Sequence, residues 1–233
     1  MNYVFPPHAQ PELPVLGTDA LFPVRRIFCV GRNYAEHARE MGATDQASGL
    51  EPPFFFMKPG DAVIGGTGEI SVNYPPITKN LHHEVEMVVA LGAGGQNVTV
   101  DAAKGLIFGY AVGFDLTRRD IQGKAKEKGH PWDMGKGFDQ SAVCSEIHPV
   151  SAVAHPASGR IWLKVNGEIR QDGDLSDMGW KVADIIANLS TMVRLEAGDL
   201  IYTGTPAGVG PIVPGDLLIA GVDGVGTLTA RIV

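Results

Sequence analysis

Cysteine is scarce in this chain, and so is positive charge. The 233 residues include two cysteines, Cys29 and Cys144, which are too few and too far apart for a disulfide scaffold or a zinc knuckle. The formal net charge is -7, and no long basic run offsets it. This balance argues against nucleic acid as a partner.

Long apolar runs are missing as well. The N-terminal MNYVFPPHAQ has no basic start followed by an apolar stretch, and no later run approaches the roughly 20 apolar residues of a membrane span. With 44% hydrophobic and 19% charged residues, the chain has the composition of an ordinary globular protein. We therefore expect a cytoplasmic protein that is neither exported nor bound to a membrane, and the few cysteines fit a reducing compartment.

The length favours one large domain. Residues 1–24 hold five of the sixteen prolines and little periodicity, so we expect an extended lead-in that packs over a single catalytic domain of residues 25–233. Short β-prone runs recur through that domain, at 25–30, 54–65, 68–75, 84–91, 109–116, 161–165, 168–170, 199–204, 216–222 and 226–233. Without a fixed repeat or a regular βαβ alternation, the chain predicts an α+β, β-rich mixed fold.

A few local signals predict helices and turns within this fold. Residues 31–41 have helical composition, with Asn33 as the expected cap, Glu36 completing a capping box and Gly42 at the C-terminal end. Residues 181–193 have helical spacing, and residues 117–128 are polar enough for a surface helix or an ordered loop. Asn166-Gly167 predicts a hairpin, and residues 43–53 predict a mobile polar loop.

Three carboxylates are candidates for a metal site. Glu84 and Glu86 are two residues apart, so on a strand they share a face, with Cα atoms roughly 6 to 7 Å apart. Taken alone, the pair fits better a strand that turns both glutamates to solvent. Asp115 ends the apolar run GYAVGFD, where it needs a helix-capping role, a basic partner or a metal. Three carboxylates would suit Mg²⁺, Mn²⁺ or Ca²⁺ rather than zinc.

Other polar residues allow two interpretations. His37 and Glu40 lie three apart on a helix, where the carboxylate can orient and polarise the imidazole, although a solvated pair has the same spacing. Lys136 is flanked by glycines but could equally be a surface lysine. His82 and His83 are adjacent on a strand and point to opposite faces, so we interpret them as structural. The turn at 203–211 lacks a phosphate-loop pattern and is either a carboxylate cradle or a plain tight turn.

Seven segments, in this order, resemble the fumarylacetoacetate hydrolase superfamily: GRNYAEHAREMG, FFFMKPGDAV, NLHHEVEMVV, GFDLTRRDIQ, KGHPWDMGKGFD, LKVNGEIRQDGDLSDM and GDLIYTGTPAGVGP. The match covers nearly everything after residue 24. It implies a mixed β-sandwich or roll of the superfamily's C-terminal domain type, a Mg²⁺ ion with Mn²⁺ as the alternative, and a homodimer.

The resemblance also assigns roles to residues. It implies that Glu84, Glu86 and Asp115 are the metal ligands. It makes His37, Glu40 and Lys136 the catalytic residues. It places Arg119, Gln122 and Thr205 on the substrate side.

Within this superfamily, the chain resembles the short, single-domain acylpyruvate hydrolases, and most of all the fumarylpyruvate hydrolases of bacterial gentisate breakdown. The expected activity is metal-dependent cleavage of a carbon–carbon bond in a small 2-oxo acid, giving fumarate and pyruvate from fumarylpyruvate. Water activated by His37 would attack the distal carbonyl, and Lys136 would donate to the oxyanion.

Three other functions stay open at this point. Oxaloacetate decarboxylation and isomerisation of an oxo-dioic acid would use the same metal site without an activated water, and a non-catalytic metal-stabilised binding protein would use no chemistry. The His37–Glu40 pair favours hydrolysis. A fumaryl tail would need a second anion site, for which the candidates near in sequence are Arg118, Arg119, Lys124, Lys126 and Lys128.

Overall fold

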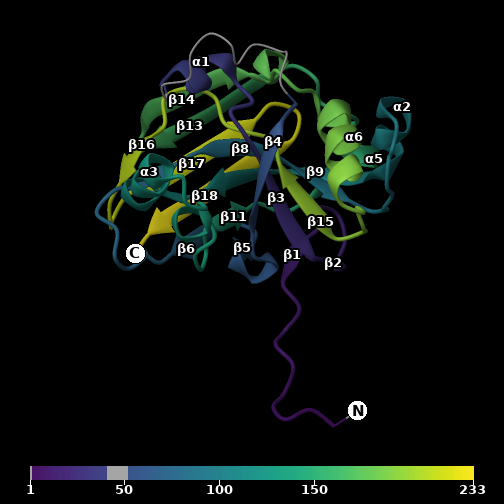
Figure 1. Cartoon of the computed structure of the whole chain (residues 1–233), viewed down its shortest axis with the longest axis horizontal. Helices are drawn as coiled ribbons and strands as arrows, with labels where there is room; N and C mark the ends of the chain where they lie inside the picture. The colour runs from purple at the N-terminus through teal and green to yellow at the C-terminus, as the bar shows by residue number, and fades with distance from the viewer. Residues whose placement is uncertain (1, 41–51) are drawn as a thin grey trace.

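Strands make up most of the computed structural model, which describes residues 2–40 and 52–233 (Figure 1). The larger sheet has the order β4 (Phe54–Lys58), β3 (Arg26–Gly31), β15 (Asp199–Tyr202), β8 (Val85–Leu91), β9 (Ile107–Asp115), β11 (Ala142–Cys144) and β5 (Val63–Gly65), with β12 (His148–Pro149) paired to β9. The second sheet has the order β14 (Glu168–Asp174), β13 (Arg160–Val165), β17 (Leu217–Val222), β18 (Gly226–Ile232) and β6 (Glu69–Val72). The β-rich mixed fold expected from the sequence is confirmed.

Two small sheets complete the strands. One has the order β10 (Thr117–Arg118), β7 (Leu81–His83) and β16 (Gly210–Ile212). The other is a ribbon of β1 (Glu12–Pro14) and β2 (Leu21–Pro23), so the expected lead-in contains paired strands that the sequence did not predict.

The central strand β8 shows how the core is divided. Its side chains alternate, so Val85, Met87 and Val89 join the core cluster that includes residues of the second sheet. Val88 and Ala90 point the other way and join a smaller cluster that includes residues of the β1–β2 ribbon. The larger sheet is therefore buried on both faces in its middle, which explains the nearly continuous apolar sequence of this strand.

Helices lie around the sheets rather than between them (Figure 1). The longest, α6 (Val182–Met192), confirms the helix expected at 181–193. The next longest, α3 (Arg119–Lys128), shows that most of 117–128, expected as a surface helix or an ordered loop, is a helix. The others are short: α1 (Ala35–Glu40), α2 (Val100–Ala103), α4 (Asp133–Lys136), α5 (Val150–Val153) and the 3₁₀ turns η2 (Gly60–Ala62), η3 (Lys104–Leu106) and η4 (Leu175–Asp177). Across the described part of the chain, no helix has the length and apolar character needed to span a membrane.

The predicted capping box at the first helix is wrong. Helix α1 begins at Ala35, and Asn33 Oδ1 accepts a hydrogen bond from the Trp180 N–H at 2.7 Å. Its Nδ2 donates to the carbonyl of Thr203 at 2.7 Å, so a tertiary link replaces the local cap. The predicted C-terminal Gly42, and all of the predicted 43–53 loop up to residue 51, lie outside the described residues.

The hairpin predicted at Asn166-Gly167 is confirmed. It joins β13 to β14, and both turn residues have positive φ, 51° at Asn166 and 88° at Gly167. Two successive positive φ angles characterise the turn that matches the right-handed twist of a hairpin.

The inter-sheet core should dominate stability. Leu163 of β13 is 0% exposed, whereas Ile169 of β14, in the same hairpin, is 43% exposed. We expect Leu163→Ala to lower the free energy of unfolding by about 2 to 5 kcal/mol, because it removes buried methyl groups and leaves a cavity. Urea denaturation would measure this, with Ile169→Ala as the matched control at below about 1 kcal/mol. Equal losses in the two variants would contradict the proposed position of the core.

Candidate active site

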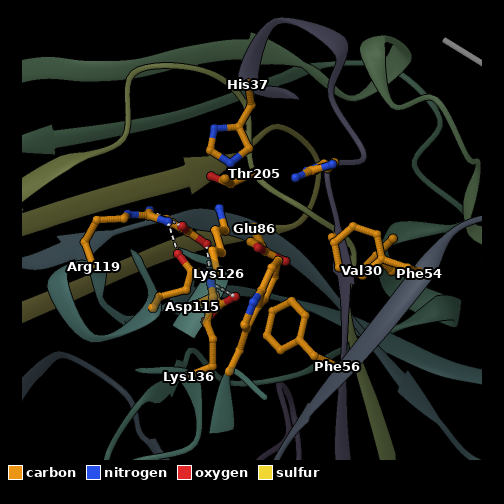
Figure 2. Close-up of a pocket in the computed structure, with 15 residues that line it drawn as sticks. Val30, His37, Phe54, Phe56, Glu86, Asp115, Arg119, Lys126, Lys136 and Thr205 are labelled. Atoms are coloured by element: carbon orange, nitrogen blue, oxygen red, sulfur yellow. Dashed lines mark hydrogen bonds and ion pairs between the residues drawn. The ribbon is translucent and has the colours of Figure 1, made fainter. Parts of the chain in front are cut away.

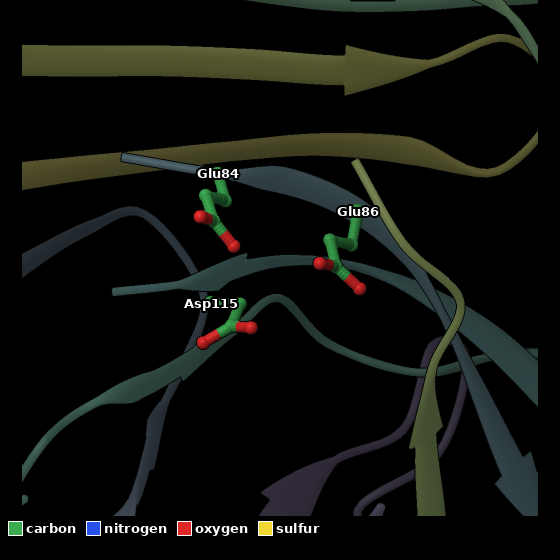
Figure 3. Close-up of side chains that lie close together, drawn as sticks. All are labelled: Glu84, Glu86 and Asp115. Atoms are coloured by element: carbon green, nitrogen blue, oxygen red, sulfur yellow. The ribbon is translucent and has the colours of Figure 1, made fainter. Parts of the chain in front are cut away.

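Glu84, Glu86 and Asp115 meet at one end of the larger sheet (Figure 3). Glu84 immediately precedes β8, Glu86 lies in it, and Asp115 ends the neighbouring β9, where its N–H donates to the Glu84 carbonyl at 2.9 Å. One oxygen from each carboxylate lies within 4.8 Å of the others, and all three residues are buried. The two glutamates do share a face, as predicted, but other parts of the chain cover that face instead of solvent.

Three cations balance these carboxylates. Lys136 Nζ lies 2.8 Å from Glu84 Oε2 and 2.7 Å from Asp115 Oδ2. Lys58 Nζ lies 2.7 Å from Asp115 Oδ1, and the Arg119 guanidinium pairs with Glu84. Such pairing is what allows carboxylates to be buried at low cost. Lys136 and Arg119 were predicted as site residues from the sequence, but Lys58 was not. It belongs to the segment FFFMKPGDAV, for which no individual residue was assigned a role.

The two glutamates differ in their affinity for protons. Burial would raise the pKa of Glu84, but the charges of Lys136 and Arg119 outweigh it and hold the pKa below its usual value. Burial raises the pKa of Glu86 well above its usual value, and the negative charges of Asp115 and Glu84 raise it further. A cation bound between the carboxylates would favour the ionised form of Glu86.

This donor set fits a small divalent metal ion. Carboxylate oxygens are hard ligands, which Mg²⁺ and Mn²⁺ accept, and three of them converge on one point. Glu86 also accepts the Gly204 N–H at 2.7 Å, which fixes its orientation. The described chain therefore holds a candidate divalent-metal site, whose three carboxylate ligands suit both Mg²⁺ and Mn²⁺.

A pocket opens over the carboxylates (Figure 2). The other residues expected at the site reach it too, since His37, Arg119, Gln122, Lys136 and Thr205 all line this pocket. The remaining walls include Arg32, Phe54, Phe56, Lys126 and Trp132. The structure thus brings together every predicted site residue except Glu40, which lies directly behind His37.

His37 and Glu40 form the pair that the sequence suggested. His37 Nδ1 lies 3.2 Å from Glu40 Oε2, and the Glu40 carboxylate also accepts the Gly208 N–H at 3.2 Å. Burial lowers the pKa of the His37 imidazole, which the negative charge of Glu84 opposes only in part. The imidazole is therefore neutral near pH 7, as a general base must be. Figure 2 shows it on the side of the pocket away from Lys136.

Thr205 is held in place by Gln171, a residue that the sequence reasoning missed. Gln171 Nε2 donates to Thr205 Oγ1 at 2.7 Å and to the Pro206 carbonyl at 2.8 Å. Its Oε1 accepts the Val85 N–H at 3.0 Å and lies 2.9 Å from His83 Nδ1. One buried amide thus joins the 203–211 turn to the start of β8. Gln171 lies within the segment LKVNGEIRQDGDLSDM, but no spacing rule singles it out there, because its role arises from tertiary contacts.

Arg119 and Gln122 form one unit at the start of α3. Arg119 Nη1 donates to Gln122 Oε1 at 2.8 Å while the same guanidinium pairs with Glu84. Arg119 was expected on the substrate side, and it also belongs to the network of cations around the carboxylates.

Metal binding should stabilise the folded chain. We expect excess Mn²⁺ to raise the melting temperature, because an ion that binds the folded state alone adds about 2.7 kcal/mol at 100 times its Kd. Glu86→Gln should lose most of this increase, since it replaces a ligand carboxylate with an amide. Differential scanning fluorimetry would test this, with exposed Glu36→Gln as the control. The ligand assignment fails if Glu86→Gln responds to Mn²⁺ as the unaltered chain does.

Two named proteins are similar to this chain over most of its length. A fumarylpyruvate hydrolase from a Ralstonia species is 44% identical over 183 residues, covering 78% of this chain and 94% of that protein. The mouse (Mus musculus) mitochondrial oxaloacetate tautomerase FAHD1 is 42% identical over 208 residues, covering 89% of this chain and 91% of that protein.

A solved structure of fumarylpyruvate hydrolase from Pseudomonas aeruginosa, in complex with Mn²⁺ and pyruvate, superposes with a TM-score of 0.95. It is 45% identical, and the match covers 100% of this chain and 99% of that one. The family model described as "Fumarylacetoacetate (FAA) hydrolase C-terminal" matches residues 26–233. The chain is a member of the fumarylacetoacetate hydrolase family, with the fold that this family shares.

Proposed function

We propose that this protein hydrolyses the carbon–carbon bond of an acylpyruvate, and that fumarylpyruvate, cleaved to fumarate and pyruvate, is its preferred substrate. The observation that carries the proposal is the His37–Glu40 pair, which lies in the same pocket as the three carboxylates. Support comes from the fumarylpyruvate hydrolases among its relatives, one of them solved with Mn²⁺ and pyruvate.

Separate groups of residues would bind the metal ion and hold the 2-oxo acid end of the substrate. A divalent ion held by Glu84, Glu86 and Asp115 would polarise the 2-oxo acid and favour charge on its enolate oxygen. Thr205 and Gln122 would hold the 2-oxo acid end by hydrogen bonds. Because these side chains are fixed by Gln171 and Arg119, little reorganisation would be needed when substrate binds.

The bond-breaking step needs a base and a donor. Neutral His37 would take a proton from water as the water attacks the distal carbonyl, and Glu40 would stabilise the imidazolium that forms. The Lys136 ammonium would donate to the oxyanion of the tetrahedral intermediate. Its pKa is raised because the charges of Asp115 and Glu84 outweigh the opposing effect of burial, so the lysine stays protonated and acts as a donor. Collapse of the tetrahedral intermediate would break the carbon–carbon bond and release fumarate and the enolate of pyruvate, which takes up a proton at carbon to give pyruvate.

A second candidate is the keto–enol tautomerisation of oxaloacetate. The relative named for this activity covers more of the chain than the Ralstonia hydrolase, at nearly the same identity. Tautomerisation moves protons within one substrate and, like decarboxylation or isomerisation of related acids, needs no attacking water. A tautomerase also needs a base, so the His37–Glu40 pair favours hydrolysis only over decarboxylation. The preference for hydrolysis over tautomerisation rests on the fumarylpyruvate hydrolase solved with Mn²⁺ and pyruvate, which is 45% identical and covers 100% of this chain. The proposal of an acylpyruvate hydrolase also includes a homodimer located in the cytoplasm.

The deciding assay follows the enol ultraviolet absorbance of fumarylpyruvate and of acetylpyruvate, together with the release of pyruvate. The proposal expects chelator-sensitive release of pyruvate, faster from fumarylpyruvate. Pyruvate from acetylpyruvate alone would make the protein a general acylpyruvate hydrolase. Release from neither substrate would reject hydrolysis, and turnover of oxaloacetate would then be measured.

Removing the proposed base should separate chemistry from binding. We expect His37→Asn to lower kcat by about 10² to 10⁴-fold, the usual contribution of a positioned base, while Mn²⁺ binding stays intact. Steady-state kinetics with a parallel Mn²⁺ titration would measure both effects. Full turnover in this variant would show that another group activates the water.

The pH profile should carry the signature of His37. Protonation removes a general base, so kcat/KM falls as the pH drops through the folded-state pKa, which burial lowers below the ordinary 6.5. At saturating Mn²⁺, we expect an acid limb with its midpoint below 6.5 and a plateau above it. An acid limb centred above 6.5 would be incompatible with a buried neutral imidazole as the base.

A further inference from the structure

Two cations of the pocket have no carboxylate partner among the described residues. Lys58, Lys136 and Arg119 are each paired with Glu84 or Asp115. Arg32 and Lys126 line the same pocket and form no ion pair with any described carboxylate. Since the three buried carboxylates are already matched by three cations, Arg32 and Lys126 are positive charges with no carboxylate left to pair with in the part of the chain that the structure describes.

Aromatic rings place these two cations along one wall. Lys126 Nζ lies 5.0 Å from the centroid of the Trp132 ring, and the Arg32 guanidinium carbon lies 5.8 Å from that of Phe54. The Phe54 and Trp132 rings meet edge to face, with centroids 5.6 Å apart. Cations over aromatic faces are held in position without losing their charge, so both remain able to bind an anion.

The backbone conformation of Arg32 and the pKa of Lys126 also favour an anion-binding role for these two residues. Arg32 has a φ of 58°, a left-handed conformation that is uncommon for arginine and is concentrated at functional sites. Burial lowers the pKa of Lys126, and the positive charges of Arg119 and Arg32 lower it further. An anion between the two side chains would relieve this repulsion.

The five candidates from the sequence are thereby reduced to one. Arg118, Lys124 and Lys128 do not line the pocket, and the Arg118 guanidinium lies over the Phe138 ring, 4.4 Å from its centroid. Arg119 is engaged with Glu84. Lys126 remains, and it is joined by Arg32, which stands far from the others in sequence.

We propose that Arg32 and Lys126 form a second anion subsite, which binds the distal carboxylate of a dioic acylpyruvate. Phe54 and Trp132 would pack against the unsaturated chain between the two ends of the substrate. This assignment rests on the proposed acylpyruvate hydrolysis and names the substrate class, because acetylpyruvate has no distal carboxylate. A dianion such as fumarylpyruvate would use both the metal end and this subsite.

The first test measures the ratio of kcat/KM for fumarylpyruvate to kcat/KM for acetylpyruvate. We expect Lys126→Met to lower this ratio about 10- to 100-fold, the usual scale for a lost charge-assisted hydrogen bond in a partly enclosed site. Arg32→Met should lower it less, about 3- to 10-fold, because Arg32 is exposed at the rim. Lys124→Met, exposed on the same helix and outside the pocket, is the matched control and should leave the ratio unchanged. An unchanged ratio in Lys126→Met would overturn the subsite.

A second measurement keeps the subsite testable if hydrolysis itself is not found. Fumarate binding would be measured by calorimetry with Mn²⁺ and saturating pyruvate present, so that the metal end is already occupied. A Kd at least about 10-fold weaker in Lys126→Met than in Lys124→Met would support the subsite independently of turnover. Equal affinity, or no fumarate binding to the unaltered protein, would overturn it.

Discussion

Three carboxylates buried within 4.8 Å of one another impose the electrostatic requirement on which the rest of the site depends. Such a group is tolerated only if cations or protons balance it. Here Lys58 comes from β4, Lys136 from α4 and Arg119 from the start of α3, so three separate elements supply the balance. These elements also supply part of the pocket wall, with Phe54 and Phe56 from β4, Gln122 and Lys126 from α3, and Lys136 from α4.

The turn after β15 connects the two halves of this arrangement. Its Gly204 N–H orients Glu86, and its Gly208 N–H binds Glu40 behind the imidazole. Two features exclude a side chain at position 204. The φ of Gly204 is +99°, which other residues rarely adopt, and a Cβ there would lie 2.7 Å from the Cβ of Asn33. The metal end and the base end are therefore positioned by one short stretch of backbone, which gives the sequence TGTPAGVGP a role beyond a plain turn.

Periodicity predicted much of the fold because alternation and turn chemistry are local. It placed Glu84 and Glu86 on one face and located the Asn166-Gly167 hairpin. It could not show that the polar face was covered, and so alone it favoured solvent-exposed glutamates; the resemblance to a family reversed that judgement. The Asn33 cap was wrong because a tertiary bond to Trp180 replaces the local one.

The residues that escaped prediction share a physical cause. The partners of Lys58 and Gln171 are distant in sequence, and Arg32 lines a pocket whose other walls are distant in sequence. No rule of local spacing identifies such residues. The side chains that act on neighbours three residues away, such as His37 and Glu40, were recognisable in advance.

Hydrolysis, as opposed to proton transfer within an intact substrate, is the central claim. The most direct test is to incubate the protein, Mn²⁺ and fumarylpyruvate in water enriched in oxygen-18, and to analyse the fumarate by mass spectrometry. Attack of water on the distal carbonyl predicts fumarate that carries solvent oxygen in its new carboxylate, at a rate set by the enzyme. Enzyme-dependent loss of the enol without formation of labelled fumarate would contradict the account and indicate a tautomerase.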